Sequence, residues 1–220
     1  MRSPFLKVEV PTTFNDHPGT FSALFYTEIH RCNLNCYQCH NRHSFKGKVE
    51  LLKEEELKEK LRMLKLLGVE LIIVSGGEPT LEPRLERGIE ILKEEGFPVR
   101  LDTNGTFPEK LEKLLENRLI DGIALDVKIP LLDEYTPDQL KRFRRILFSN
   151  ESLDPSAVYN YSKRVKITIN LIKRYSLPYT ILRTVRYPLL TCGEIELIKE
   201  ELKSLPYSHQ VNPFFPVEEE

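Results

Sequence analysis

Three cysteines lie close together in the chain, at Cys32, Cys36 and Cys39, in the pattern Cys-x3-Cys-x2-Cys. Thiolates are soft ligands that bind iron–sulfur clusters and zinc. Three thiolates can hold three corners of a cubic cluster and leave one iron open to a substrate, so the spacing indicates catalytic chemistry. A zinc site is the main alternative, because such sites usually close with four ligands and His40 or His43 could supply the fourth. A disulfide fits less well, since one of the three thiols would be left over.

Two later segments carry groups suited to binding a small ligand. Gly76 and Gly77 allow a sharp bend and a close approach of the backbone, and with the carboxylate of Glu78 they could hold an ammonium group. A simple turn is the alternative there. A further apolar run ends in Asp102-Thr-Asn-Gly105, for which an Asn-Gly turn is the alternative interpretation. Each segment is a weak signal alone and becomes informative only if the fold brings them together.

Charged side chains occupy two more apolar runs. Asp126 and Lys128 are two residues apart, and side chains two apart on a strand share a face. If that face lines the inside of the fold, the charges need partners or a ligand, because unpaired buried charges are costly. Arg183 lies in the other run, where a solvated basic residue is the alternative. An acid, a base, polar amides and a metal-binding loop at one end of a sheet would suit a zwitterionic amino acid that carries a nucleoside.

The elements that must position these residues follow from alternating apolar runs and amphipathic segments. The predicted strands span residues 22–29, 70–75, 99–103, 122–129, 179–185 and 208–215. The predicted helices span residues 53–67, 85–95, 108–117, 137–147, 156–174 and 192–204. Repeated β–α units form a parallel sheet with its ligand site at the carboxyl ends of the strands, and six strands are too few for a closed eight-stranded barrel. We therefore predict an α/β fold, an open partial (β/α)6 barrel of parallel strands with helices outside, with a doubly wound sheet as the alternative.

The composition is typical of a globular protein. The chain has 220 residues, of which 40% are hydrophobic and 30% charged, and its net charge of −1 gives no overall attraction to nucleic acid or to a membrane. We expect no signal peptide and no transmembrane helix, and the clustered cysteines favour a cytoplasmic location. We expect an N-terminal extension over residues 1–20, one domain over residues 21–216 and an acidic tail over residues 217–220.

The order of these motifs resembles that of the radical S-adenosylmethionine (SAM) superfamily. The most specific elements are the three-cysteine pattern and the segment Ser75-Gly-Gly-Glu-Pro79 that follows the second predicted strand. Five further segments resemble the activating enzymes of glycyl radical enzymes, and most closely the branch that activates anaerobic ribonucleoside-triphosphate reductase. These segments are Cys39-His-Asn41, Leu101-Asp-Thr-Asn-Gly105, Leu125-Asp-Val-Lys128, Leu182-Arg-Thr-Val185 and Pro206-Tyr-Ser-His209.

The resemblance implies a 4Fe–4S cluster on Cys32, Cys36 and Cys39 whose open iron binds the amino and carboxylate groups of SAM. It implies that SAM is cleaved reductively to a 5′-deoxyadenosyl radical, which takes a hydrogen atom from a glycine of a partner glycyl radical enzyme. A flavodoxin or ferredoxin would supply the electron. The residues that it implies around SAM are Gln38, His40, Gly76, Gly77, Glu78, Asp102, Asn104, Asp126, Lys128, Arg183 and His209. Gln38 departs from the family pattern, which has an aromatic residue at that position against the adenine; here the aromatic residue is Tyr37.

Two other functions remain open from the sequence. An enzyme of the same superfamily could act on a small molecule, such as a pterin or a deazaguanine precursor, whereas a zinc-stapled binding module would not be an enzyme. The basic runs at residues 141–145 and 163–166 are either solvated helix faces or a docking surface for the partner protein. We expect Cys192 to be a small buried apolar residue and not a ligand.

Overall fold

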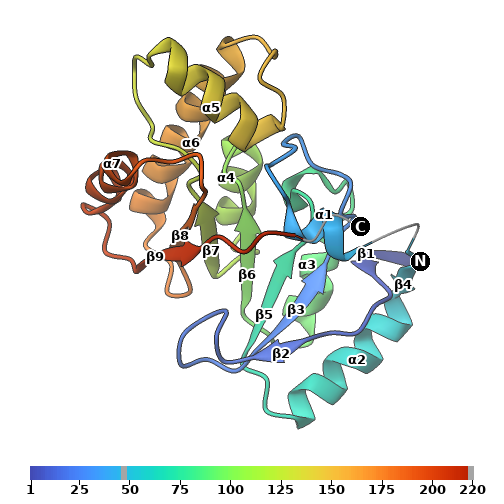
Figure 1. The fold of residues 1–220 in the computed structure, drawn as a ribbon. Helices are drawn as coiled ribbons and strands as arrows, with labels where there is room; N and C mark the ends of the chain where they lie inside the picture. The colour runs from blue at the N-terminus through green and yellow to red at the C-terminus, as the bar shows by residue number, and fades with distance from the viewer. Residues whose placement is uncertain (46–48, 218–220) are drawn as a thin grey trace.

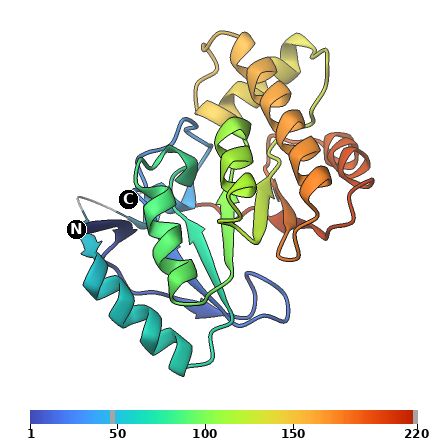
Figure 2. The ribbon, with the colours of Figure 1, turned by 180° about the vertical axis from the view of Figure 1, so that it is seen from behind.

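The computed structural model describes residues 1–45 and 49–217, which form a curled sheet with helices on its outer side (Figures 1 and 2). The strand order in the main sheet is β2-β3-β5-β6-β7-β8-β9. The strands span Thr12–Thr13 (β2), Ser22–Tyr26 (β3), Leu71–Ser75 (β5), Val99–Thr103 (β6), Gly122–Asp126 (β7), Ile181–Arg186 (β8) and His209–Pro213 (β9). The strands from β3 onward pair in parallel, and β2 adds to the edge in the antiparallel direction. The predicted open partial barrel is confirmed.

Helices return the chain from the end of one parallel strand to the start of the next. Figure 2 shows α3, α4 and α6 over the outer face of the sheet, and Figure 1 shows the inner face with these helices behind it. The helices span His40–Ser44 (α1), Glu54–Leu66 (α2), Leu85–Glu94 (α3), Pro108–Glu116 (α4), Pro137–Phe148 (α5), Ser156–Tyr175 (α6) and Cys192–Leu202 (α7), and a short 3-10 turn covers Pro79–Leu81. The long connection from β7 to β8 contains both α5 and α6.

Strand β5 shows why the parallel strands could be predicted. Its first four residues, Leu71 to Val74, are all fully buried, as is usual for a strand covered on both faces. Ile72 and Val74 join the large hydrophobic core that includes Leu57 and Ile89 from the outer helices. The neighbouring side chains on β5 face the inner side of the sheet, where the cavity described below lies.

The sequence missed the shorter elements. β1 (Arg2–Leu6) and β4 (Leu51–Lys53) form a separate two-stranded antiparallel sheet, and neither they nor β2 and α1 were predicted. The predicted strand over residues 122–129 is shorter than expected, because β7 ends at Asp126. Residues 218–220 of the expected acidic tail lie outside the described residues.

No helix within residues 1–45 and 49–217 is both long enough and apolar enough to be a membrane span.

Candidate functional site

The loop that carries the cysteines follows β3 and is held by the end of α5. The backbone N–H groups of Asn35 and Tyr37 donate to the carbonyl oxygens of Leu147 and Ile146 at 3.0 and 2.9 Å. Carbonyls in the last turn of a helix have no partner within the helix, so α5 is a ready anchor for this loop. All three cysteines of the loop are free and partly buried.

The Gly-Gly turn after β5 packs against the start of the same loop. A Cβ atom on Gly77 would lie 2.5 Å from the carbonyl oxygens of Ile29 and Arg31, and one on Gly76, whose φ is +139°, would lie 2.3 Å from a threonine hydroxyl. Asn41 from α1 donates to the Gly76 carbonyl at 2.6 Å. The glycines were predicted to permit a close approach to a ligand. Their closest neighbours belong to the protein itself, a threonine side chain for Gly76 and backbone carbonyls for Gly77, although both glycines also line the cavity.

Glu78 differs from its predicted arrangement. It is 1% exposed, and its carboxylate accepts hydrogen bonds from the Thr80 hydroxyl at 2.6 Å, the Thr103 hydroxyl at 2.8 Å and the Asn104 backbone N–H at 2.8 Å. Burial raises the pKa of Glu78, and these hydrogen bonds oppose that rise. Glu78 is absent from the residues that line the cavity. Its carboxylate therefore joins the strand-end loops of β5 and β6, and the structure does not support its expected contact with an ammonium group.

A row of alternating charges crosses the inner face of β6, β7 and β8. Arg183 Nη1 donates to Asp102 Oδ2 and its Nε donates to Asp126 Oδ1, both at 2.9 Å. Lys128 Nζ donates to the other oxygen of Asp126 at 3.2 Å. At the opposite end, the fully buried Arg100 donates from Nε to Asp102 Oδ1 at 3.0 Å. The prediction that Asp126 and Lys128 share a face is confirmed, although Lys128 lies just beyond the end of the strand.

The pKa values in this row follow from the pairing. Burial alone would raise the pKa of Asp126, but Arg183 and Lys128 hold that pKa below its ordinary value. Burial alone would lower the pKa of Lys128, but Asp126 raises it well above its ordinary value. Asp126 is therefore a carboxylate and Lys128 an ammonium at neutral pH, each stabilised by the other.

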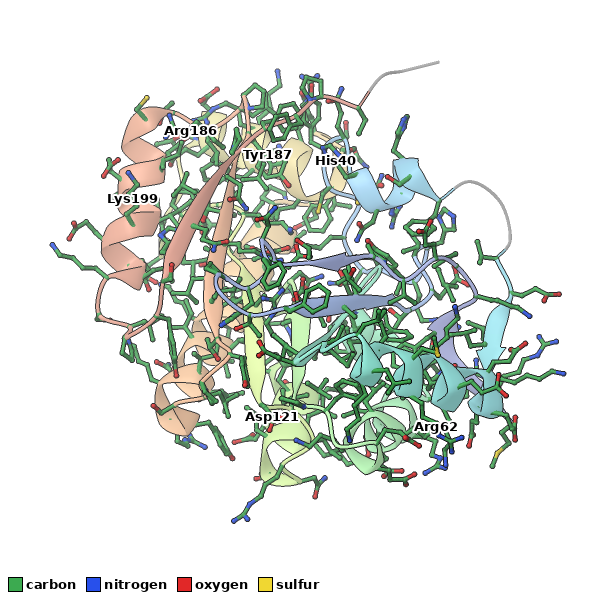
Figure 3. The ribbon with its side chains drawn as sticks, turned by 90° about the horizontal axis from the view of Figure 1, so that it is seen from below. His40, Arg62, Asp121, Arg186, Tyr187 and Lys199 are labelled. Atoms are coloured by element: carbon green, nitrogen blue, oxygen red, sulfur yellow. The ribbon has the colours of Figure 1, made fainter. Side chains whose placement is uncertain are left out.

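These parts enclose a cavity of about 390 Å³ that reaches from the cysteine loop across the inner face of the sheet. The predicted residues that line it are Cys32, Cys36, Gln38, Cys39, His40, Gly76, Gly77, Asp102, Asn104, Asp126, Lys128 and Arg183. Its lining also includes residues that sequence reasoning missed, namely Asp16, Leu24, Leu34, Tyr26, Asn41, Ser75, Thr103, Val185, Tyr187, Asn212 and Phe214. Figure 3 shows Tyr187 and His40 at the same end of the sheet. Leu34, Asn41, Ser75, Thr103 and Val185 lie within or beside the quoted motifs, and the others, such as Asp16 and Asn212, carry no motif.

His209 does not lie where the resemblance placed it. In the pairing of β8 with β9, Arg183 is opposite Gln210 and Leu182 is opposite His209. Paired residues of neighbouring strands share a face, so His209 lies on the outer face, away from Arg183. Its Nε2 is 2.9 Å from the hydroxyl of Thr184, and burial lowers its pKa. Asn212, on the same face as Arg183, lines the cavity instead.

The segment after β9 crosses the cysteine end of the cavity and runs toward α1 (Figure 1). Phe214 stacks on Tyr37 with ring centroids 5.8 Å apart, and it also contacts Tyr187 at 5.8 Å. The carbonyl oxygen of Phe215 lies 2.7 Å from His40 Nε2. The ring of His40 is therefore bonded to this segment.

The two basic runs are largely used within the fold. Arg142 pairs with Glu194 at 2.8 Å, and Arg144 donates to the carbonyl oxygens of Leu140 and Leu153. In the second run, Arg164 pairs with an acidic side chain of α4 and Lys166 with Asp133. The runs are therefore not continuous free surfaces. Cys192 is exposed at the start of α7, which corrects the prediction that it is buried.

The residues present fit the implied cluster and SAM. Three thiols share one wall of the cavity, and Asn104 Nδ2 lies 4.0 Å from Cys32 Sγ, where it can stabilise a thiolate. Burial raises the pKa of Cys36 to about 12, so a positively charged metal centre is needed to hold it as a thiolate. Gln38 has a φ of +45°, and its buried Oε1 has no hydrogen-bond partner among the described residues. An unpaired buried amide oxygen beside the cavity is available to a ligand.

A single metal ion fits less well. A zinc site brings its ligands to about 2.0–2.3 Å from one ion. Within residues 1–45 and 49–217, no group of three or more His, Cys, Asp or Glu side chains is gathered in this way. In a four-iron cluster each cysteine binds a different iron, so the three thiols that line the cavity need not converge on one ion.

Comparisons with known proteins agree on the family. A sequence profile of the Radical SAM superfamily matches residues 28–189. A protein of Methanocaldococcus jannaschii, provisionally named a glycyl-radical enzyme activating enzyme, is 41% identical over 116 residues, which cover 51% of this chain and 45% of that protein. The GTP 3′,8-cyclase of Aquifex aeolicus is 37% identical over 102 residues, which cover 44% of this chain and 32% of that protein.

Solved structures show the same fold. Streptococcus suis SuiB bound to S-adenosylmethionine superposes with a TM-score of 0.60 at 14% identity, over 89% of this chain and 39% of that chain. The match thus covers less than half the length of each of these relatives. Because the profile covers most of the sequence, the chain belongs to the radical SAM superfamily, whose members use a 4Fe–4S cluster and S-adenosylmethionine.

Proposed function

We propose that this protein activates a glycyl radical enzyme. It cleaves SAM reductively, and the resulting 5′-deoxyadenosyl radical takes a hydrogen atom from a glycine of the partner, an anaerobic ribonucleoside-triphosphate reductase. Support comes from the relative of Methanocaldococcus jannaschii, whose name includes this activity, and from the segments that resemble this branch of the superfamily.

In this proposal Cys32, Cys36 and Cys39 hold the cluster, which supplies one electron to the sulfonium of SAM when it is bound. The paired Asp126 and Lys128 border the cavity and would orient the polar end of SAM, which, unlike a triphosphate, has no excess negative charge that needs an unpaired cation. The pairing of these charges with each other and with the rest of the row fixes their positions before the ligand arrives. Cleavage of the carbon–sulfur bond leaves methionine and the radical, and hydrogen transfer from glycine gives 5′-deoxyadenosine.

The charge of the cavity is the observation that favours a peptide substrate over a nucleotide. The lysine and arginine among its described lining residues are Lys128 and Arg183, and both are already paired with aspartates. Asp16, Asp102 and Asp126 contribute three carboxylates to the same lining. A triphosphate needs unpaired arginines or lysines for its oxygens, whereas an uncharged glycine-bearing loop does not.

An enzyme that acts on a nucleotide is the second candidate, because a GTP 3′,8-cyclase is among the similar proteins. The matched part is 32% of that protein, so its remaining length has no counterpart in the alignment. If this chain bound GTP, arginines or lysines beyond the described cavity lining would have to hold the triphosphate.

The test compares the two substrates without oxygen. The enzyme, with its cluster reduced by dithionite, is mixed with SAM and either a partner reductase from the same source or GTP. We expect an electron paramagnetic resonance doublet on the partner. When the partner's glycines carry deuterium, we expect one deuterium in each 5′-deoxyadenosine, measured by mass spectrometry. Partner with the radical glycine changed to alanine is the matched control and should give neither signal.

Two outcomes would count against the proposal. If 5′-deoxyadenosine forms with GTP and the partner shows no radical, the second candidate replaces it. If the Cys36→Ala enzyme gives the same doublet as the wild type, the cysteine loop does not carry the reaction.

A further inference from the structure

The cysteine loop has a second, outer side. Cys36 and Cys39 line the inner cavity, and they also line a separate open depression of about 510 Å³ on the surface. The depression lies between the loop, α1 and the end of α5, with Ser149 on its α5 side. The same short segment of the loop, which includes Cys36 and Cys39, therefore borders both hollows, and a molecule in the depression contacts this segment from outside the cavity.

The depression is basic. Arg42, His43 and Arg145 line it, and no aspartate or glutamate does so among the described residues. Arg42 donates to the Leu34 carbonyl and to the Asn35 side chain. Both acceptors are uncharged, so these hydrogen bonds do not neutralise the positive charge of Arg42. This positive surface contrasts with the chain as a whole, whose net charge is −1.

The adjacent face of α5 extends the positive surface. Arg145 is four residues after Lys141, so the two side chains lie on one face of the helix. Arg145 and Lys141 form ion pairs at 3.3 and 3.5 Å with the same carboxylate, that of Glu151. One negative charge therefore faces two positive charges. Arg145 also lies over the ring of Tyr37, next to Cys36, with 5.5 Å to the ring centroid. The side chains of Lys141 and Arg145 are 62% and 46% exposed, so both can meet a partner.

We propose that this basic depression, formed by Arg42, His43 and Arg145 with Lys141 at its edge, docks an acidic one-electron donor protein of the flavodoxin or ferredoxin type. The inference rests on the proposed function only in requiring that the cluster on the cysteine loop be reduced. One electron leaves the reduced flavin or iron–sulfur centre of the donor, which is oxidised, and the cluster gains that electron. No bond or proton is transferred between the two proteins in this step.

Charge and position both favour an electron donor over the glycine-bearing partner. A donor needs only to approach the thiols, and opposite charges speed the encounter of two proteins that meet briefly. The glycine must instead enter the cavity on the inner side of the loop, where SAM binds. The two proteins can therefore use opposite sides of the same loop without excluding each other.

The test uses the double variant Lys141→Glu with Arg145→Glu, which changes exposed groups and leaves the cysteines and Arg42 intact. The matched control is Lys60→Glu with Arg62→Glu on α2, which alters the net charge equally. Figure 3 places Arg62 well away from His40 and the cysteine end. The probes are a purified flavodoxin and a purified ferredoxin, both reduced, and the measurement is the rate of cluster reduction by stopped-flow absorbance at low salt. We expect the double variant to be slower by about tenfold or more, and the control pair to match the wild type.

Three further measurements decide the outcome. The wild-type rate should fall as salt rises, and the salt effect should shrink in the double variant. Reduction by dithionite, and SAM cleavage driven by it, should be unchanged in the double variant. Carbodiimide cross-linking of the wild-type protein to the flavodoxin should link a donor carboxylate to Lys141, a measurement that does not depend on any variant.

Wild-type rates of reduction by both donors in the double variant would overturn the proposal, as would cross-links confined to lysines elsewhere. Normal donor-driven reduction with loss of the partner's glycyl radical would assign the surface to the protein substrate instead. If the proposed function is wrong, the partner shows no glycyl radical but the donor still reduces the cluster. This result differs from failure of the docking proposal, in which the double variant is reduced at the wild-type rate.

Discussion

Replacing Arg183 with methionine tests whether the row of charges holds the inner face of the sheet together. Arg183 is 20% exposed at its side chain and bonds two aspartates at once, Asp102 and Asp126, each at 2.9 Å. Removing one partner of a buried ion pair costs about 3–5 kcal/mol, because a charge is left without compensation. We expect the lower end, about 3 kcal/mol, since Asp102 keeps Arg100 and Asp126 keeps Lys128.

The loss should depend on pH in a defined direction. The pKa of Asp126 is lowered in the folded protein, so its ion pairs stabilise the fold above its ordinary pKa of 3.8. That stabilisation is lost as the pH falls through the still lower folded value. The deficit of the Arg183→Met variant should therefore be largest near neutral pH and should shrink only below pH 3.8, as Asp126 of the wild type takes up a proton.

The assay is urea denaturation of both proteins at pH 7 and at a series of pH values below 3.8, followed by circular dichroism without oxygen. A deficit of about 3 kcal/mol corresponds to a drop in melting temperature of roughly 6–12 °C for a protein of this size. Lys128→Met is the matched control: it removes one bond of 3.2 Å and leaves Asp126 with Arg183, so it should cost only about 1.5 kcal/mol. Equal losses in the two variants, or a loss that grows as the pH falls below 3.8, would refute the reasoning.

Three further variants address the loops around the site. Cys36→Ala should lose most of the bound iron and sulfide while Cys192→Ala keeps both, and full iron content in the first would remove Cys36 from the ligand set. Gly77→Ala would place a methyl group 2.5 Å from two backbone carbonyl oxygens, so it should destabilise the fold by about 1–3 kcal/mol and lower iron content; a wild-type melting curve would contradict this packing. Glu78→Gln loses an acceptor for hydroxyl and backbone N–H donors and should cost about 1–3 kcal/mol, while a change confined to SAM affinity would restore the predicted contact with the ligand.

The parallel strands β3, β5 and β7 could be predicted because each is a short, mostly apolar run. The strands β6, β8 and β9 contain charged or polar residues, and their place in the alternation of strands and helices was what indicated them. The ends of all these strands were therefore predicted too, and with them the meeting of the cysteine loop, Asp102, Asp126 and Arg183 in one cavity. The elements β2 and β4 were missed because two or three residues are too few to show a period. The elements β1 and α1 were missed because β1 contains a proline and α1 contains no apolar residue.

Side-chain direction was harder to predict than position along the chain. His209 lies on β9, which pairs with the strand that carries Arg183, as expected. In the observed register His209 is opposite Leu182, so its side chain faces outward. A shift of the register by one residue would have turned it inward. Glu78 lies beside the cavity loop, yet its oxygens are taken by hydroxyl and backbone donors from two loops. Neither the register nor the competing donors can be read from a motif, because both depend on residues distant in sequence.

The anchoring of the cysteine loop links its two sides. Carbonyls at the end of α5 accept hydrogen bonds from Asn35 and Tyr37, so this helix sets where the thiols lie. The exposed face of the same helix carries Lys141 and Arg145 beside the outer depression. A protein that docks there contacts the element that positions the thiols, and it can approach them without entering the cavity. An acidic donor would therefore approach the cluster beside the part of the loop that α5 anchors, while the inner side stays open to SAM and to the substrate.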